Sequence, residues 1–248
     1  VNLARCFPAL DKAARTVLAR ATFRALGRGL LETTIAWWGT PERLRAFVRL
    51  EGAEGLALLA ARRGPLLVLS PHFVGMELAA ARIALEHDGM AFYSKQKNKV
   101  FDAFLAGRRQ RFRPIRLLAR QDGVKPAVRG LREGLPLFYP GDLDFGARDA
   151  VFAPFFGVQA ATITALPRLA RLTGAKVIVA VPRQFAPGEP YVVTLSPPFA
   201  DFPTVSIEED VARINAVIEE HVRPIPEQYY WVHKRFKTRP PGEAGFYS

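Results

Sequence analysis

The stretch that decides the fold runs from Pro65-Leu-Leu-Val-Leu-Ser70 through Pro71-His-Phe-Val-Gly75 into Met76-Glu-Leu-Ala-Ala-Ala-Arg-Ile-Ala-Leu-Glu86. Its first part is a short apolar run, which is typical of a buried strand. Its last part has the apolar spacing of a helix. We therefore predict a strand–turn–helix unit over residues 65–86, with His72 in the turn.

The rest of the chain repeats this alternation. Further runs with strand character, separated by helical stretches, lie at 91–94, 115–118, 135–139, 176–182 and 191–195. Such alternation predicts an α/β fold with a mostly parallel central sheet flanked by helices. Ligands bind at the carboxyl ends of strands in open α/β sheets, so we expect His72 and the loops after Tyr139 and Pro182 to share one edge.

The N-terminal part is predicted to be helical. Apolar residues between Leu10 and Trp38 recur every three or four positions, with a break expected at Gly27 and Gly29. Two further helices are predicted at 41–50 and 55–62. We expect residues 1–62 to be mainly helical and residues 63–248 to form the α/β catalytic core of a single domain, because no linker or repeat marks a boundary.

Composition narrows the classes of partner. The chain has 248 residues, 49% of them hydrophobic, and 35 Lys and Arg against 23 Asp and Glu, for a formal charge of +12. This excess favours an anionic partner, whether nucleic acid, a membrane surface, or an acidic or phosphorylated molecule. The single cysteine, Cys6, excludes an intramolecular disulfide. The sequence contains no stretch of about 18 uncharged apolar residues, so no segment is predicted to be a membrane-spanning helix.

The sequence lacks the motifs of several common metal sites and enzyme classes. None of the four histidines has the spacing or the cysteine company of a zinc site, so we expect no metal. The Gly-x-Ser-x-Gly turn of serine hydrolases and the phosphate-binding loop Gly-x-x-x-x-Gly-Lys do not occur either.

His72 and Glu77 are the first candidate catalytic pair. A histidine with an ordinary pKa of about 6.5 can remove the proton of an attacking hydroxyl. A carboxylate on its other ring nitrogen fixes the tautomer and stabilises the imidazolium. Residues five apart on a helix diverge by about 140°, so Glu77 must reach back from the first helical turns. The alternative is that His72 caps the helix and Glu77 is an ordinary first-turn acid.

Arginines are dense between residues 108 and 120. They are Arg108, Arg109, Arg111, Arg113, Arg116 and Arg120. They suit lipid phosphates or the phosphopantetheine and acidic surface of a carrier, and one suits a developing oxyanion. The alternative is a solvated basic face. Nucleic acid is not expected, because the cluster lacks interleaved aromatic residues and no nucleic-acid-binding motif accompanies it.

Two later segments are further candidates. Asp142 and Asp144 lie in the turn 140–146, where they either position an arginine or a substrate hydroxyl or form ordinary turn bonds. The apolar segment 151–157, which includes Phe155, is either core or a wall for a greasy ligand.

Taken in order, these segments resemble one family, the late acyltransferases of bacterial lipid A biosynthesis. The motifs that carry the resemblance are His72-Phe-Val-Gly-Met-Glu77, Arg108-Arg-Gln-Arg-Phe112, Asp142-Leu-Asp-Phe-Gly146, Val151-Phe-Ala-Pro-Phe-Phe-Gly157 with Ala160-Ala-Thr-Ile-Thr164, and Pro226-Glu-Gln-Tyr-Tyr-Trp-Val-His-Lys-Arg-Phe-Lys-Thr-Arg-Pro240. The ordered set spans most of the chain and is far more specific than any single member.

The resemblance implies an activity, a location and site residues. The reaction moves an acyl chain from acyl carrier protein to a hydroxyl of a lipid A precursor, at the cytoplasmic face of the bacterial inner membrane, without a metal or nucleotide cofactor. The family's histidine, glutamate and arginine fall on His72, Glu77 and Arg109, and its aspartate falls on Asp142. The residues expected to contact substrate are Arg108, Arg111, Asp142, Asp144 and Phe155.

Two departures leave alternatives open. Leu143 replaces the middle residue of the family's Asp-Gln-Asp turn, and the family's N-terminal membrane helix is absent. We expect that helix to precede Val1. The alternatives are a related enzyme with another phospholipid or glycolipid acceptor and an acyl-CoA donor, or a non-catalytic basic protein. We also expect anionic lipid to bind the arginine cluster and the aromatic segments near Phe155 and Trp231.

Overall fold

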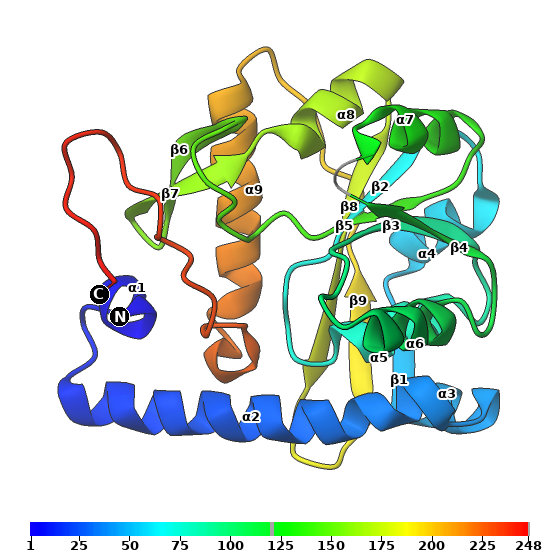
Figure 1. Cartoon of the computed structure of the whole chain (residues 1–248), viewed down its shortest axis with the longest axis horizontal. Helices are drawn as coiled ribbons and strands as arrows, with labels where there is room; N and C mark the ends of the chain where they lie inside the picture. The colour runs from blue at the N-terminus through cyan, green and yellow to red at the C-terminus, as the bar shows by residue number, and fades with distance from the viewer. Residues whose placement is uncertain (120–121, 248) are drawn as a thin grey trace.

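The structure is a computed structural model that describes residues 1–119 and 122–247 (Figure 1). Its centre is a seven-stranded sheet of order β1-β9-β8-β2-β5-β3-β4. Neighbouring strands are parallel except β8 and β9, which are antiparallel. The strands are β1 Val48–Glu51, β2 Leu66–Leu69, β3 Gly89–Tyr93, β4 Ile115–Ala119, β5 Leu137–Tyr139, β8 Lys176–Gln184 and β9 Tyr191–Leu195. The predicted mostly parallel α/β sheet is confirmed.

Helices cover both faces of this sheet (Figure 1). They are α1 Asn2–Cys6, α2 Lys12–Trp38, α3 Pro41–Phe47, α4 Ala53–Ala61, α5 Met76–Ile83, α6 Lys99–Arg109, α7 Lys125–Arg132, α8 Ala165–Thr173 and α9 Ile207–Val222, followed by the short 3-10 helix η2 Pro226–Gln228. A separate antiparallel hairpin of β6 Ala150–Phe155 and β7 Val158–Ile163 packs against α9.

The central strand β2 shows why the sheet needs two helical layers. All four of its residues are buried. Leu67 and Leu69 join the apolar cluster formed with α7, α8 and α9, whereas Leu66 and Val68 join the cluster formed with α2 to α5. Successive strand residues point to opposite faces, so a continuous apolar run is buried on both sides.

Two expectations about the N-terminal half are wrong. The helix predicted to break at Gly27 and Gly29 continues without interruption through α2. A Cβ on Gly29 would lie 2.4 Å from Val74 Cγ1, so this glycine permits close packing instead of ending the helix. The helix predicted at 41–50 ends at Phe47, and the following residues form the edge strand β1 on β9.

The β6–β7 hairpin was not predicted as regular structure. The apolar segment 151–157 supplies β6 and its turn, and Phe155 is fully buried in the core. Of the two interpretations offered for this segment, core packing is therefore correct for Phe155.

Candidate active site

His72 lies in the turn between β2 and α5, as predicted. This turn, residues 70–75 and hereafter the catalytic turn, ends at Gly75, whose φ is 91°. A Cβ on Gly75 would lie 2.5 Å from a ring carbon of Tyr191. Both the backbone conformation and the close approach therefore require glycine. The constraint directs the chain sharply from the strand into the helix and leaves His72 at the carboxyl edge of the sheet.

A buried aspartate holds His72. Strand β5 pairs in parallel with β2, so the loop after Tyr139 leaves the sheet beside the catalytic turn. Asp142 in that loop is 1% exposed. Its Oδ1 lies 2.6 Å from His72 Nδ1, and its Oδ2 accepts hydrogen bonds from the His72 backbone N–H and from the Tyr229 hydroxyl, both at 2.9 Å. Asp142 thus fixes both the ring and the backbone of the histidine.

The electrostatics define the protonation states of this pair. Burial alone would raise the pKa of Asp142, but the charge of His72 and the hydrogen bonds from His72 and Tyr229 bring it down to about 2. Burial opposes the charged form of His72, yet Asp142 raises the histidine pKa overall. An ionised Asp142 only accepts hydrogen bonds, so Nδ1 carries the proton in the neutral ring. Nε2 is then the nitrogen that can accept a proton from a hydroxyl.

Tyr229 reinforces the ionised carboxylate. Burial, together with the negative charge of Asp142, raises the pKa of Tyr229 well above its ordinary value. The hydroxyl therefore stays protonated and donates to Asp142. The sequence offered one signal for this residue, its place in the motif of residues 226–240, but that motif gave it no role.

The predicted pairing of Glu77 with His72 is wrong. Glu77 in the first turn of α5 instead accepts from Arg109, the last residue of α6. Arg109 Nε lies 3.1 and 3.2 Å from the two carboxylate oxygens, and Nη2 also donates to Oε1. The five-residue separation turns Glu77 away from His72, as the helical geometry warned. The position beside His72 Nδ1 is filled by Asp142 from the neighbouring strand end.

Arg108 and Arg111, which were expected to contact substrate, bind the C-terminal end of α2. Arg108 Nη1 donates to the Trp37 carbonyl at 3.2 Å. Arg111 donates from Nη1 to Ala36 and from Nη2 to Gly39, at 3.1 and 2.7 Å. Cations at this end satisfy terminal carbonyls and complement the helix dipole. Their contacts join α6 to α2.

The other arginines of the cluster are dispersed. Arg113 donates to the Leu85 carbonyl, and Arg116 pairs with Glu133 on the surface. Arg120 lies outside the described residues. The structure therefore brings one arginine of the described cluster, Arg109, into a carboxylate pair near the catalytic turn.

Asp144 and Phe155, also expected at the substrate, occupy structural positions. Asp144 Oδ1 accepts from Gly146 N and from the Thr238 hydroxyl, and Oδ2 accepts from Thr238 N, at 2.9, 2.8 and 2.6 Å. These bonds fasten the C-terminal segment to the acidic turn. The ring of Phe155 is enclosed among Phe156, Tyr229 and Phe236.

An apolar cavity of about 120 Å³ lies between the sheet, α5 and α6. Ser70 and Pro140 line it at the carboxyl edge of the sheet, and Ile115, the first residue of β4, lines it towards the opposite edge. Small residues of α5 give it room, and Glu77, Arg108 and Arg109 supply its ionic lining. Its other apolar lining residues include Ala80, Ala84, Ala91, Leu117, Phe138 and Ala180.

A histidine base that a buried carboxylate holds, in a turn whose Ser70 lines an apolar cavity, suits an enzyme that activates a hydroxyl beside a hydrocarbon chain. Comparison with known proteins agrees. The family model described as "Bacterial lipid A biosynthesis acyltransferase" matches residues 1–238. The chain belongs to this family, and it is an acyltransferase.

Two sequence relatives, both lipid A acyltransferases, support the same assignment. The lipid A biosynthesis lauroyltransferase of Escherichia coli K12 is 34% identical over 247 residues, covering 99% of this chain and 80% of the relative. The palmitoleoyltransferase of the same strain is 31% identical, with the same coverage of both chains. The solved structure of the 1-acyl-sn-glycerophosphate acyltransferase of Thermotoga maritima is 15% identical, with a TM-score of 0.46, covering 90% of this chain and 87% of that one.

Proposed function

We propose that the protein transfers a fatty acyl chain from acyl carrier protein to a hydroxyl of a lipid A precursor. The proposal rests on His72, which Asp142 fixes in a turn whose Ser70 lines an apolar cavity, in a chain of this family. We further propose that it works at the cytoplasmic face of the bacterial inner membrane. In the part of the chain that the structure describes, no helix is both long and apolar enough to cross a membrane.

The mechanism follows from the two nitrogens of His72. Nδ1 donates to Asp142, so Nε2 removes the proton of the acceptor hydroxyl as its oxygen attacks the thioester carbonyl. The new C–O bond forms, the C–S bond of the resulting tetrahedral intermediate breaks, and the departing thiolate takes the proton back from Nε2. Asp142 stabilises the transient imidazolium. A positioned base of this kind supplies about 10² to 10⁴ in rate.

Glu77 and Arg109 have a different part in this proposal. Glu77 engages Nε and Nη2 of Arg109, which fixes the guanidinium and leaves Nη1 for a substrate oxygen. Arg109 stabilises the carbonyl oxyanion, and Glu77 acts through it as a positioning residue. The same pair lines the apolar cavity, where the acyl chain of the donor lies.

A mass-spectrometric transfer assay tests the proposal. It offers acyl carrier protein and coenzyme A thioesters of several chain lengths, with a lipid A precursor and a lysophospholipid as acceptors. We expect transfer from the carrier protein to the lipid A precursor, reduced at least about 10²-fold by His72→Ala. Transfer only from coenzyme A, or only to the lysophospholipid, would identify the related phospholipid enzyme instead. Undiminished transfer by folded His72→Ala would refute the mechanism.

A further inference from the structure

Helix α2 carries an apolar face that none of the described residues covers. It extends along one side of the molecule, at the bottom of Figure 1. Its inward residues Thr22, Ala25, Gly29 and Ala36 are buried. Its outward residues include Val17, Phe23, Leu30, Leu31 and Trp38, each more than half exposed. Their successive separations of six, seven, one and seven positions place them within about 140° of one another around the helix axis, so they share one face. Exposed apolar residues gathered in this way mark an interaction surface.

This face continues onto α6. Trp38 lies against Phe104, with ring centroids 5.6 Å apart, and Phe104 stacks on Phe101 at 6.3 Å. Phe101 and its neighbour Val100 are themselves exposed, at 44% and 81%. We call the exposed residues Val17, Phe23, Leu30, Leu31 and Trp38 of α2, with Val100 and Phe101 of α6, the docking face.

Most of the charges around the docking face are positive. Arg20 and Arg24 stand between its apolar residues, and Lys95, Lys97 and Lys99 precede or begin α6 in exposed positions. Glu32, the single acid of α2, is turned inward. Its carboxylate accepts from the Tyr191 hydroxyl at 2.8 Å and from Gln184 Nε2 at 3.2 Å. Asp102 of α6 accepts a hydrogen bond from Gln96 N, and the mostly cationic rim suits an anionic surface.

We propose that the docking face binds the surface of an anionic lipid bilayer, with α2 lying in the plane of the membrane interface. Aromatic and aliphatic side chains on one exposed face, with arginines beside them, suit a helix that lies in the membrane interface. The placement replaces the lipid surface expected near Phe155 and Trp231, since both of these side chains are buried. It rests on the proposed function only in explaining how a lipid acceptor reaches the site, because Ala36 and Trp37 at the end of α2 also line the cavity.

Vesicle binding by the full chain tests this proposal without requiring catalysis. The probes are phosphatidylcholine vesicles with and without about one-third phosphatidylglycerol. We expect preferential binding to the anionic vesicles that weakens with salt, and at least about a tenfold loss of partitioning for Leu30→Asp or Phe23→Asp. The double variant R20E/R24E should lose the preference for anionic lipid.

Matched controls lie on the far side of the fold. Val205 is 98% exposed just before α9, at the end of that helix away from α2, and Arg132 is exposed on α7. Val205→Asp and Arg132→Glu should bind like the unaltered chain. Equal losses in these controls, or undiminished binding by Leu30→Asp, would overturn the proposal. A dimer that Leu30→Asp dissociates in the absence of lipid would show that a second copy covers this face.

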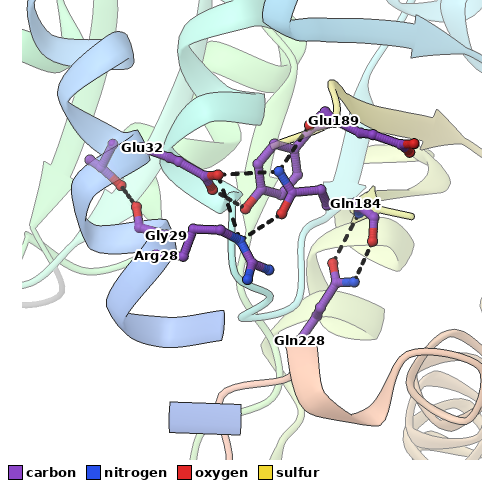
Figure 2. Close-up of polar contacts among 8 residues, drawn as sticks. Arg28, Gly29, Glu32, Gln184, Glu189 and Gln228 are labelled. Atoms are coloured by element: carbon purple, nitrogen blue, oxygen red, sulfur yellow. Dashed lines mark hydrogen bonds and ion pairs between the residues drawn. The ribbon is translucent and has the colours of Figure 1, made fainter. Parts of the chain in front are cut away.

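A second inference comes from the buried amide pair Gln184 and Gln228 (Figure 2). Gln228 Oε1 accepts from the Gln184 backbone N–H at 3.0 Å, and its Nε2 donates to the Gln184 carbonyl at 2.6 Å. The Gln228 carbonyl accepts from Val74 N at 2.7 Å, and Tyr230 N donates to the His72 carbonyl at 3.0 Å. Residues 228–230 therefore run beside the catalytic turn and hold it on both sides of Phe73.

Gln228 thereby ties the catalytic turn to a central strand. Its side chain is clamped to the end of β8, while the backbone next to it holds His72 and also positions Tyr229 for its bond to Asp142. Both glutamines are nearly inaccessible, at 2% and 3%. We infer that Gln228 is a positioning residue, which keeps His72 Nδ1 in register with Asp142. This inference rests on the proposed role of His72.

The Gln184 side chain offers an internal comparison. It accepts from Arg28 Nε at 2.9 Å and donates to Glu32 and to the Glu189 carbonyl, so it links β8 to α2 (Figure 2). Gln184→Ala removes those bonds but keeps the backbone groups that Gln228 uses. Substitutions of Gln228 and Gln184 therefore distinguish the bonds that attach the catalytic turn to β8 from the bonds that attach α2 to β8.

Enzyme kinetics measured as a function of pH test the positioning role of Gln228. For Gln228→Glu, which keeps the acceptor and loses the donor, we expect kcat to fall about tenfold or more with KM little changed. The acidic limb should move to lower pH, because a displaced His72 loses the carboxylate that raises its pKa. Gln184→Ala should leave that limb in place. So should Asn215→Ala, which removes another buried amide, bonded to the Pro154 carbonyl.

Two results would overturn the second inference. One is a Gln228→Glu enzyme that is less stable but has the kcat and pH profile of the unaltered chain. The other is an equal shift of the acidic limb in Asn215→Ala, which would show that loss of any buried amide has this effect. If Gln228→Glu does not fold, Gln228→Met provides the same readout without a buried charge. Absence of acyl transfer by the unaltered chain would instead count against the proposed function.

Discussion

Replacing Asp142 with asparagine is the perturbation whose outcome the geometry specifies most closely. Asp142 Oδ2 receives two donors, the His72 backbone N–H and the Tyr229 hydroxyl. In the variant these donors select the amide oxygen, so the amide NH₂ faces His72 Nδ1. That nitrogen must then accept instead of donate, which transfers the ring proton to Nε2. Nε2, the nitrogen proposed to act as the base, then already carries a proton and cannot accept one from the acceptor hydroxyl.

The size of the effect can be estimated. In serine proteases the corresponding loss of tautomer control lowers kcat by about 10⁴, and we expect about 10³ to 10⁴ for D142N. The acidic limb should also move to lower pH, since Asp142 raises the pKa of His72. The depression of the Asp142 pKa from 3.8 to about 2 corresponds to about 2 kcal/mol of stability.

The sign of the stability effect follows from linkage. A carboxyl group whose pKa is lower in the folded chain stabilises it above the unfolded pKa, near 3.8, and loses this contribution as the pH falls to about 2. D142N should flatten that part of the curve of unfolding free energy against pH. Single-turnover transfer measured from pH 5 to 9, with Glu77→Gln as the matched carboxylate control, provides the kinetic test. A D142N enzyme within about threefold of the unaltered kcat would refute the reasoning.

The remaining predictions concern packing and the cavity. Tyr229→Phe removes one bond to the Asp142 carboxylate and should lower the unfolding free energy by about 1.5–3 kcal/mol in urea titration, whereas an unchanged midpoint would contradict the assigned bond. Gly29→Ala should destabilise by about 1–3 kcal/mol because its Cβ would lie 2.4 Å from Val74 Cγ1. Its partner Gly27→Ala, with no atom within 4 Å of the added Cβ, should stabilise by up to about 1 kcal/mol, and equal melting shifts would undermine the packing argument. Ala84→Phe fills the cavity and should shift the preferred donor to shorter chains in the mass-spectrometric assay, so an unaltered preference would place the acyl chain elsewhere.

The fold was largely predictable because local patterns specify it. The apolar run before Ser70 and the helical spacing after Gly75 locate the strand–turn–helix unit, and the alternation of such segments predicts the parallel sheet. Long-range packing explains the failures. Gly29 was interpreted as a helix break because its sequence neighbours do not reveal its contact with Val74.

The partner of His72 shows where sequence reasoning stops. Glu77 was chosen because it is close in sequence, and Asp142 is 70 residues away. Their contact depends on β2 and β5 being adjacent, which strand order alone decides and local spacing does not. Resemblance pointed to Asp142 as a site residue, but not to its bond with His72. The expectation that the loop after Tyr139 shares an edge with His72 was the nearest signal.

The directions in which Arg108, Arg111 and Phe155 point could not be predicted, for a different reason. Residue type correctly predicted which of these side chains are charged and which are apolar, but it did not predict in which direction each side chain points. Arg108 and Arg111 point to α2 carbonyls, and Phe155 points into the core. Tyr229 was named within a motif without a role, since nothing local connects its hydroxyl to Asp142.

In the proposed mechanism, the contact with Asp142, and not one with Glu77, holds the His72 base. Proton and nitrogen NMR of the His72 ring measures it most directly, in the unaltered chain and in the variants D142N and E77Q. We predict a strongly hydrogen-bonded Nδ1 proton that persists in E77Q and is lost in D142N. An Nδ1 proton that survives in D142N but disappears in E77Q would show that Glu77, and not Asp142, holds the ring.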